Sequence, residues 1–382
     1  MKFIHTSDWH IGRQFHNVSL LEDQQYVLKQ IVAYISQASV DALVIAGDIY
    51  DRSVPPATAV ALLDEVLNQI CSKMAVPVII IPGNHDSAER LSFASRQLSH
   101  AGLHIMADLD KVTEPVIIKS AKESICFYGI PYNDPEHVND HYAIKLNSHD
   151  EAHAFLLDKI RSSLDENNLN VLVSHCFIDG GEASESERPL SIGGADRVST
   201  GHFKGFDYVA LGHLHGPQYR GEEYIRYSGS ILKYSFSEQH HKKAVTLVET
   251  QGHQLKGVSQ LALEPLRNMR VIEGEIETII EQGKTDPHAD DFLLVRLTDA
   301  HAILNAMGQL RKVYPNVLHL EKPGLMAINE NHQLQREKLK LSELDMFCDF
   351  FNHVSGRDLT EEQQAGLEDV INMLHNREGA LK

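Results

Sequence analysis

The sequence predicts an α/β protein in which a layered N-terminal domain is followed by a small α+β domain and C-terminal helices. Short apolar runs alternate with amphipathic helical patterns over residues 1–265, as expected where strands and helices pack in layers. A shorter series of strands and helices begins near Pro265, and residues 336–382 contain two helical stretches without a clear strand. We therefore expect three parts with the boundaries 1–265, 266–335 and 336–382.

The first part contains eight apolar runs with the length of buried strands: Phe3–Ile4, Ala42–Ala46, Val76–Ile81, Ile125–Tyr128, Val171–Val173, Tyr208–Leu211, Tyr224–Tyr227 and Ala244–Val248. Apolar side chains recur at helical spacing in Leu20–Ala38, Ala57–Met74 and Ala152–Leu164, which predicts amphipathic helices. The polar segment 176–206 is expected to form a long loop, and loops of that length are usually functional or mobile.

The second part reads as strand, helix, strand, helix and strand, in the order Arg270–Ile276, Thr278–Gln282, Phe292–Leu297, Ala300–Val313 and Val317–Leu320. The third part predicts helices over Leu341–Asn352 and Thr360–Leu374. Thr360 stands at the expected N-cap of the last helix and Gln363 at the reciprocal position of a capping box.

Composition limits the classes of function. The 382 residues include 35 Lys and Arg against 53 Asp and Glu, a net charge of −18, which argues against a simple nucleic-acid binder with a basic face. A polyanion could still bind if metal ions or a partner supplied positive charge. The four cysteines form no CxxC pair, which indicates neither a disulfide framework nor a thiolate zinc site. Without an apolar run of about 18–20 residues, we expect a soluble cytoplasmic protein and no membrane.

Five predicted strands end in residues of metal-binding type. Because sites in α/β proteins form beyond the carboxyl ends of parallel strands, these side chains should meet in one crevice. They are Asp8, His10, Asp48, Asn84, His175, His213 and His215. Each motif alone has an ordinary explanation in turn chemistry, but the ordered set does not. His240 and His241, beside Lys242 and Lys243, have no such strand and are expected in a solvated or phosphate-facing patch.

The donors are nitrogen and oxygen, without sulfur, and seven of them exceed what one tetrahedral zinc ion needs. Such a set favours two Mn²⁺ or Fe²⁺ ions with open water positions, although zinc is not excluded. One aspartate between two cations can bridge them. Two ions about 3.5–4 Å apart form the arrangement that clamps phosphoryl groups.

The series D-x-H, GD, GNHD, a single H and GHxH resembles the motifs of calcineurin-like metallophosphoesterases. The segments HTSDWHIG, AGDIYDRSVPP, PGNHDS, YVALGHLH and IRYSGSI are similar to those of bacterial nuclease subunits that process DNA double-strand breaks. The resemblance covers nearly the whole chain. It implies a layered β-sandwich flanked by helices, an α+β DNA-capping domain, and C-terminal helices that bind an ATPase.

The same resemblance implies roles for the site residues. One ion would be held by Asp8, His10, Asp48 and His215, and the other by Asp48, Asn84, His175 and His213. Asp48 would bridge the two ions, His85 would be the catalytic histidine, and Asp86 would orient His85 or its turn. The chain departs from the family pattern at Asp51, where some branches have histidine, and at Ile231, where proline is frequent.

The function that the resemblance implies is DNA-end processing in repair, recombination and replication. It comprises 3′→5′ exonuclease activity on duplexes and endonuclease activity on single strands and hairpins, with two divalent ions, most simply Mn²⁺. The implied partners are DNA and a Rad50-type SMC ATPase, the SbcC subunit, in a heterotetramer that contains a homodimer of this chain. Candidate DNA contacts are Arg13, Arg52, Arg90, Ser228, Gly229 and Ser230.

Two alternatives remain open at this point. The first is a metallophosphoesterase acting on small phosphodiesters, for which the residues after 265 would be superfluous. The second is a catalytically silent scaffold, which should have lost a metal ligand or the catalytic histidine, whereas all eight residues are present. Apolar side chains at near-helical spacing in residues 341–374 could pack on the chain's own α+β domain or clasp the ATPase.

Overall fold

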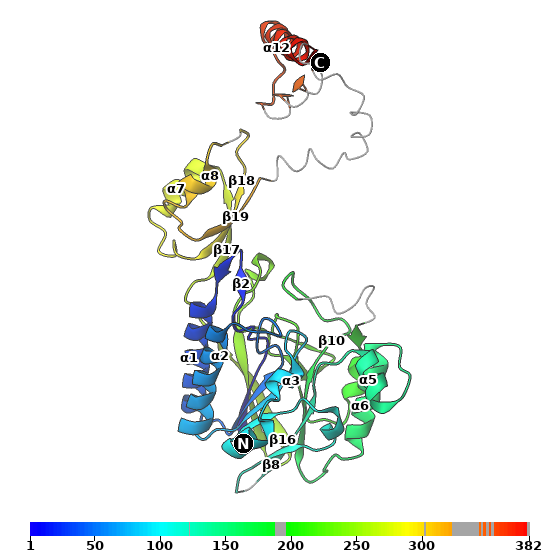
Figure 1. The fold of residues 1–382 in the computed structure, drawn as a ribbon. Helices are drawn as coiled ribbons and strands as arrows, with labels where there is room; N and C mark the ends of the chain where they lie inside the picture. Colours follow the sequence, from blue (N-terminus) through cyan, green and yellow to red (C-terminus); the bar gives the residue numbers. More distant parts are fainter. Residues whose placement is uncertain are drawn as a thin grey trace. The chain divides into compact units, whose positions relative to one another are not determined.

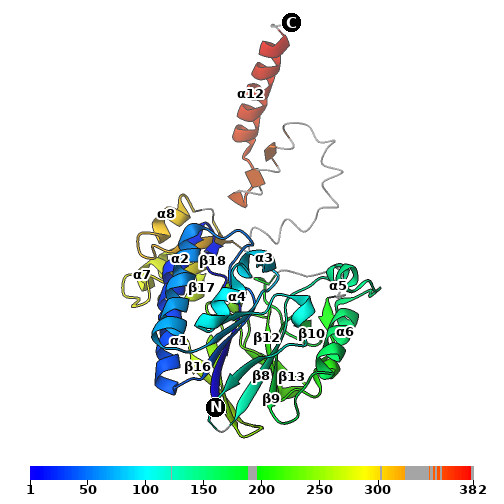
Figure 2. The same ribbon diagram turned by 60° about the horizontal axis from the view of Figure 1, so that its bottom comes forward.

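The computed structural model describes residues 1–121, 123–187, 196–301, 303–322, 344, 347–348, 351–352 and 355–379. The chain divides into two compact units, Met1–Met269 and Arg270–Lys382. Figures 1 and 2 show the first unit as two sheets, with α1 and α2 on one side and α5 and α6 on the other. This is the layered β-sandwich flanked by helices that the sequence predicts.

The first sheet has six strands. In spatial order they are β16 (Gln254–Ala262), β15 (Ala244–Gln251), β1 (Lys2–Thr6), β4 (Ala42–Ala46), β5 (Val78–Ile81) and β6 (Leu103–Ile105). Strands β1, β4, β5 and β6 run parallel, whereas β15 is antiparallel to both β1 and β16. Helices α1 (Leu21–Ala38) and α2 (Ala57–Leu67) connect the parallel strands, and a π-helical turn, Asn68–Lys73, continues α2. The short helices α3 (Ala88–Leu91) and α4 (Ser95–Leu98) follow β5.

The second sheet also has six strands. In spatial order they are β13 (Gln218–Arg220), β14 (Glu222–Tyr227), β12 (Tyr208–Gly212), β9 (Leu169–His175), β8 (Ser124–Ile130) and β7 (Val116–Lys119). Its four central strands are parallel. Helices α5 (Pro135–Tyr142) and α6 (His149–Arg161) lie between β8 and β9 in the chain. Two-stranded pairs add β2 (Gln14–Phe15) with β3 (Val18–Ser19), and β10 (Phe177–Ile178) with β11 (Arg197–Val198).

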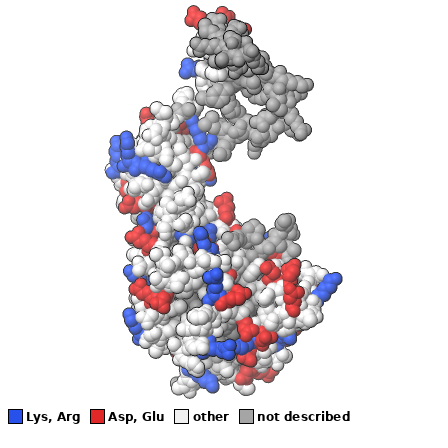
Figure 3. Space-filling view, in the orientation of Figure 1, with Lys and Arg blue, Asp and Glu red and all other residues white. Residues whose placement is uncertain are grey.

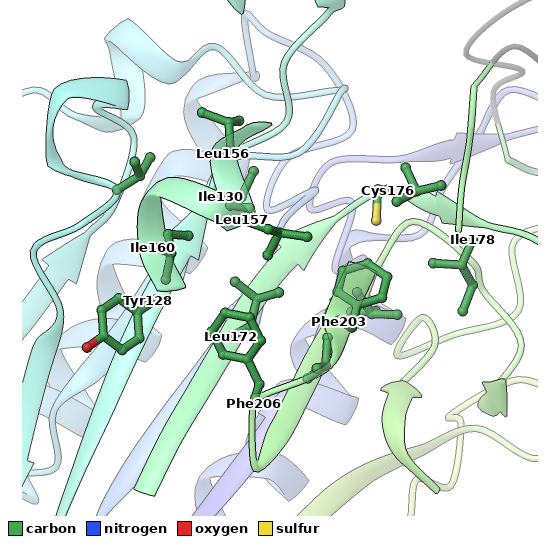
Figure 4. Packing of buried hydrophobic residues seen from close by; sticks show 14 of the residues in the cluster. Tyr128, Ile130, Leu156, Leu157, Ile160, Leu172, Cys176, Ile178, Phe203 and Phe206 are labelled. Carbon is green, nitrogen blue, oxygen red and sulfur yellow. The ribbon is translucent and has the colours of Figure 1, made fainter. Parts of the chain in front are cut away.

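A hydrophobic layer joins the two sheets. Phe3 on β1 packs edge-on against Phe127 and Tyr208 of the second sheet, with ring centroids 5.3 and 5.6 Å away. On its other face the second sheet packs against α6, and Figure 4 shows Leu156 and Ile160 of that helix in this layer. Each large side chain buried here contributes about 1.5–3 kcal/mol, so the sheets are firmly fixed relative to each other.

The second unit contains a three-stranded sheet and two short helices, in the predicted order. The elements are β17 (Met269–Gly274), α7 (Ile276–Gly283), β18 (Phe292–Leu297), α8 (Ala306–Leu310) and β19 (Val317–Glu321). Helix α12 (Glu361–Gly379) follows. Its predicted capping box is confirmed, since Gln363 N donates to Thr360 Oγ1 at 3.3 Å and Thr360 N donates to Gln363 Oε1 at 3.0 Å.

All eight strands predicted for the first part are present, but the predicted helix Ala300–Val313 is wrong in extent. Asn305 has a φ of 52° in the left-handed region, so α8 begins only at Ala306. Most of the predicted helix Leu341–Asn352 lies outside the described residues. Within the described part of the chain, no helix is long and apolar enough to cross a membrane.

His5 is a buried histidine in the middle of β1, as expected of a core residue. Its Nε2 lies 3.1 Å from Leu211 O, an acceptor, and its Nδ1 lies 3.0 Å from the hydroxyl of Tyr208. Nε2 therefore carries the proton, and Nδ1 accepts from Tyr208. Burial lowers the pKa of His5 to about 3, so the ring is neutral in the folded protein at pH 5.

We predict that this histidine makes the first unit acid-sensitive. The unfolded chain binds a proton at His5 below pH 6.5, whereas the folded chain does so only near pH 3. This group therefore leaves the free energy of unfolding unchanged above pH 6.5. Between pH 6.5 and about pH 3 it lowers the free energy of unfolding by about 1.4 kcal/mol per pH unit as the pH falls. Urea unfolding of the wild type and His5→Gln at pH 7 and pH 5 checks this. Between pH 7 and pH 5, the free energy of unfolding of the variant should decrease less than that of the wild type, because its unfolded chain takes up one proton fewer. Equal decreases would contradict the prediction.

Candidate metal centre

The seven predicted ligands converge at the carboxyl ends of parallel strands from both sheets. Those of the first sheet are Asp8 and His10 after β1, Asp48 after β4 and Asn84 after β5. Those of the second sheet are His175 at the end of β9, and His213 and His215 after β12. All except Asn84 are buried.

Asp48 lies between the two halves of the cluster. Its Oδ2 is 3.6 Å from His10 Nε2 and 3.6 Å from His175 Nε2. Its Oδ1 accepts a hydrogen bond from the backbone N–H of His85 at 2.8 Å. One carboxylate oxygen thus faces imidazoles on both sides, which is the position that a bridging ligand requires.

Asp8 takes part in two groups of candidate ligands. In the first group, its carboxylate lies within 4.8 Å of ring nitrogens of His10 and His215. In the second group, it lies within 4.8 Å of a carboxylate oxygen of Asp48 and a ring nitrogen of His175. The carboxylate also accepts from the backbone N–H of His213, at 3.1 and 3.2 Å. This hydrogen bond ties the end of β1 in the first sheet to the end of β12 in the second.

Two further close approaches complete the donor set. The Nε2 atoms of His10 and His215 are 3.1 Å apart, a distance at which they must share a proton or a cation. Asn84 Oδ1 lies 3.0 Å from His175 Nε2 and 3.2 Å from His213 Nδ1. His175 Nδ1 is 2.9 Å from Ala46 O, which fixes the proton on Nδ1 and makes Nε2 the metal-binding atom.

The electrostatics of the cluster also fit bound cations. Burial raises the pKa of Asp8, and burial together with the nearby Asp8 raises the pKa of Asp48 well above its usual range. Burial and neighbouring imidazoles lower the pKa of His10 and His213 well below 6.5. Two buried carboxylates this close together are costly unless positive charge is supplied. Divalent ions would supply it, and an oxygen and nitrogen donor set is the type that they bind.

The backbone at the site is held in sparsely populated conformations. Asp8, His10, Asp48 and His213 have φ values of 52°, 44°, 52° and 107°. Such residues cost about 1–3 kcal/mol each and persist only where the surrounding structure enforces them. Gly212 shows how closely the sheets approach, since a Cβ there would lie 1.8 Å from Ala46 O and 2.8 Å from His175 Nδ1.

His85 lies beside the cluster at its edge. Its ring centroid is 4.6 Å from that of His10, and its Nδ1 lies 2.7 Å from Asp51 O. Because that oxygen only accepts, Nδ1 carries a proton. Asp86 accepts from Ile49 N, Tyr50 N and Gly83 N at 2.9–3.0 Å. Of the two roles considered for Asp86, these contacts favour holding the turns that carry Asp48 and Asn84.

The predicted DNA contacts occupy different surroundings. Arg13 is mostly buried, 3.3 Å from Asp51 Oδ1 and over the ring of Tyr234, whereas Arg52 and Arg90 are exposed. Ser228 and Ser230 are buried and donate to His5 O and Leu232 O, and Gly229 between them has a φ of 81°. Their contacts with a substrate remain predictions.

Sequence reasoning missed a polar network behind His215. Glu238 and Lys243 form a buried ion pair that also contacts this histidine. The expectation that Lys243 belongs to a solvated or phosphate-facing patch is therefore wrong. Burial raises the pKa of Glu238, but the Lys243 ammonium and the contact with His215 outweigh this effect and hold the pKa well below its usual range. Asp51 is also absent from the predicted site residues, although its Oδ1 lies 3.8 Å from His10 Nδ1.

Comparisons with known proteins bear on the family to which the chain belongs. Residues 1–217 match the family model of the calcineurin-like phosphoesterases, and residues 265–355 match the type 5 capsule protein repressor C-terminal domain. A Staphylococcus epidermidis protein, named as the D component of the nuclease SbcCD, is 32% identical over 99% of this chain and 100% of its own. A protein of the same name from Staphylococcus saprophyticus is 35% identical over 98% of each chain. A solved dimetal phosphatase from Danio rerio is 13% identical, with a TM-score of 0.40 over 69% of this chain and 98% of its own.

We predict that Gly212→Ala destabilises the first unit and weakens metal binding. The added methyl group would meet the backbone oxygen of Ala46, and overpacking of this kind costs about 1–3 kcal/mol or more. Gly257→Ala on β16 is the matched control, because its Cβ meets no atom within 4 Å. Urea unfolding compares the two variants, and equal midpoints would contradict the close approach of the sheets.

We also predict that the chain binds two divalent ions and that Asp48→Ala lowers the bound metal to less than one ion per chain. The substitution removes a carboxylate that lies 3.6 Å from imidazoles on both sides, and the two cations would then repel across a weakened site. Plasma mass spectrometry of dialysed protein should give two Mn²⁺ per chain for the wild type and fewer than one for the variant. Asp64→Ala, on the exposed face of α2, should retain both. An Asp48→Ala protein that keeps two ions would contradict the bridging role.

Proposed function

Because this chain belongs to the calcineurin-like phosphoesterases and, within them, to the SbcD nuclease family, we propose that it hydrolyses the phosphodiester bonds of DNA with two divalent ions. The proposed activities are a 3′→5′ exonuclease on duplex ends and an endonuclease on single strands and hairpins. The observation that carries the proposal is the buried cluster of oxygen and nitrogen donors on both sides of Asp48.

The ligands divide into two proposed subsites that share Asp48. Subsite A consists of Asp8, His10, Asp48 and His215. Subsite B consists of Asp48, Asn84, His175 and His213. We propose Mn²⁺ as the physiological ion. Two bound ions would neutralise charge that develops on the phosphoryl oxygens and would lower the pKa of water toward neutrality.

His85 is the proposed catalytic histidine. The contact of its Nδ1 with Asp51 O fixes the orientation of the ring at the edge of subsite A. From there the imidazole would stabilise charge on the phosphoryl group or deliver a proton to the leaving 3′ oxygen. General acid catalysis of this kind contributes about 10²–10⁴ in rate.

We further propose that an SbcC-type ATPase supplies much of the surface that binds DNA. Acidic and basic side chains are interspersed on the face shown in Figure 3, and the chain carries a net charge of −18. Helix α12, Glu361–Gly379, is one of the two proposed contact helices. Leu341 and Phe350, which belong to the other predicted contact helix, lie outside the described residues. A homodimer within a heterotetramer is part of the same proposal.

A nuclease assay tests the proposed function directly. Labelled blunt duplex, single-stranded and hairpin DNA would be incubated with the chain in Mn²⁺ or Mg²⁺, with and without the ATPase, beside bis-p-nitrophenyl phosphate. We expect Mn²⁺-dependent cleavage of DNA that is absent from Asp48→Ala prepared in parallel. Hydrolysis of the small diester without cleavage of any DNA would instead favour the small-substrate alternative. Loss of all turnover in the wild type, with metal bound, would favour the silent scaffold.

We predict that His85→Ala separates metal binding from chemistry. The proposal places its side chain in neither subsite, so the variant should retain two Mn²⁺ and its affinity for DNA while single-turnover cleavage falls by about 10²–10⁴. His253→Ala, in the exposed turn between β15 and β16, is the control and should cleave normally. Metal loss in His85→Ala would show that the residue maintains the turn of Asn84 instead, and an active variant would remove the catalytic role.

A further inference from the structure

Every polar atom of His215 other than Nε2 contacts a group outside the proposed ligand set. Its backbone N–H donates to Glu187 Oε1 at 2.8 Å. Its backbone oxygen accepts from Lys243 Nζ at 2.8 Å and from Ser230 N at 3.1 Å. Its Nδ1 forms a short hydrogen bond with Ser186 Oγ. Only Nε2 remains to face His10 in subsite A, at 3.1 Å.

Glu238 organises the contacts on the Nδ1 side of this ring. The carboxylate is fully buried at the end of the 3₁₀ turn Phe236–Glu238. Its Oε1 accepts from the hydroxyls of Ser186 and Ser184 and lies 3.5 Å from His215 Nδ1. Ser186 thus stands between a buried carboxylate and a metal-binding imidazole, an arrangement that orients histidine ligands in metal sites.

Lys243 holds the same histidine from the other side. Its ammonium group is buried and donates to Glu238 Oε2, to His215 O and to Ser230 Oγ, the last two at 2.8 Å. All three donors of the ammonium group are therefore used. The carboxylate of Glu238 thus lies beside the ring of His215, and the ammonium group of Lys243 donates to its backbone oxygen.

Stability alone is a poor explanation for this pair. Buried ion pairs are often replaced by well-packed apolar residues without loss of stability, because the desolvation of two charges offsets their attraction. The equivalent ring in subsite B, His175, is oriented by a backbone carbonyl, Ala46 O. The two subsites therefore use different supports, one from the main chain of β4 and one from a charge pair.

We propose that Glu238 and Lys243 are positioning residues that set the metal affinity of subsite A, with Ser186 as the link between the carboxylate and His215. The inference rests on the proposed two-metal function and concerns the same centre. It assigns separate control to subsite A, which could lose its ion while subsite B keeps its own. It also makes the segment 184–187 part of the metal centre, because Ser186 and Glu187 both contact His215.

Calorimetric titration of the full chain with Mn²⁺, without DNA, tests the proposal. The wild type should bind two ions. Glu238→Gln should bind one ion as the wild type does and the other about 10–100-fold more weakly. Lys243→Met should weaken the same ion, and Lys243→Arg should weaken it less. Glu123→Gln is the matched control, since Glu123 is paired with the N-terminal ammonium at the opposite end of β1, and it should bind both ions normally.

A double-mutant cycle identifies the subsite that is affected. Adding Glu238→Gln to His215→Ala should cause no further loss of Mn²⁺ affinity, whereas adding it to His175→Ala should cause its full effect. Nuclease activity of Glu238→Gln should recover at high Mn²⁺, as expected when only affinity is changed. If Glu238→Gln does not fold, Ser186→Ala replaces it in the test. This variant removes one hydroxyl and should weaken binding of the same ion.

Three results would overturn the proposal. The first is that Glu238→Gln, or Ser186→Ala if Glu238→Gln does not fold, binds both ions with the affinities of the wild type. The second is that a variant binds both ions equally more weakly, as a general structural defect would cause, and the third is full additivity of Glu238→Gln with His215→Ala. A wild-type chain that binds no Mn²⁺ would instead contradict the proposed function itself, before any variant is compared.

Discussion

The fold brings the carboxyl ends of two parallel sheets so close together that a single carboxylate, that of Asp48, faces imidazoles from both. Its Oδ2 is 3.6 Å from His10 on one side and 3.6 Å from His175 on the other. This approach depends on Gly212, where any side chain would collide with the backbone of β4. The hydrogen bond from His213 N to Asp8 joins the same two sheet ends. The rest of the centre is arranged around this junction.

Such a junction is unfavourable by itself. Burial raises the pKa of Asp8, and burial together with the nearby Asp8 raises the pKa of Asp48. Several ligand positions also have left-handed backbone conformations. The packed layer of Phe3, Phe127, Tyr208 and their neighbours between the sheets enforces this arrangement. A site that is strained and rich in buried negative charge is suited to cations. The architecture therefore places stability in the sandwich and chemical function at its carboxyl edge.

Much of this could be predicted because each ligand lies within a few residues of the end of a short apolar run, and strand ends are a local property of sequence. His175, for example, follows Val171–Val173 without any other motif. The edge strands β6, β7 and β16 escaped prediction because they are short or partly exposed, so their apolar pattern is weak. The support of His215 escaped for a different reason. Ser186 and Glu238 are 52 residues apart and meet only through tertiary structure, and Lys243 in a row of polar residues has the local pattern of a surface lysine.

The claim on which the account depends is that Asp48 lies between two metal ions. Anomalous diffraction from crystals soaked in Mn²⁺ tests it most directly, because it locates the ions independently of activity. The account predicts two anomalous peaks about 3.5–4 Å apart, one beside His10 and His215, the other beside His175 and His213, with the Asp48 carboxylate between them. A single peak, or two peaks that do not share Asp48, would contradict it.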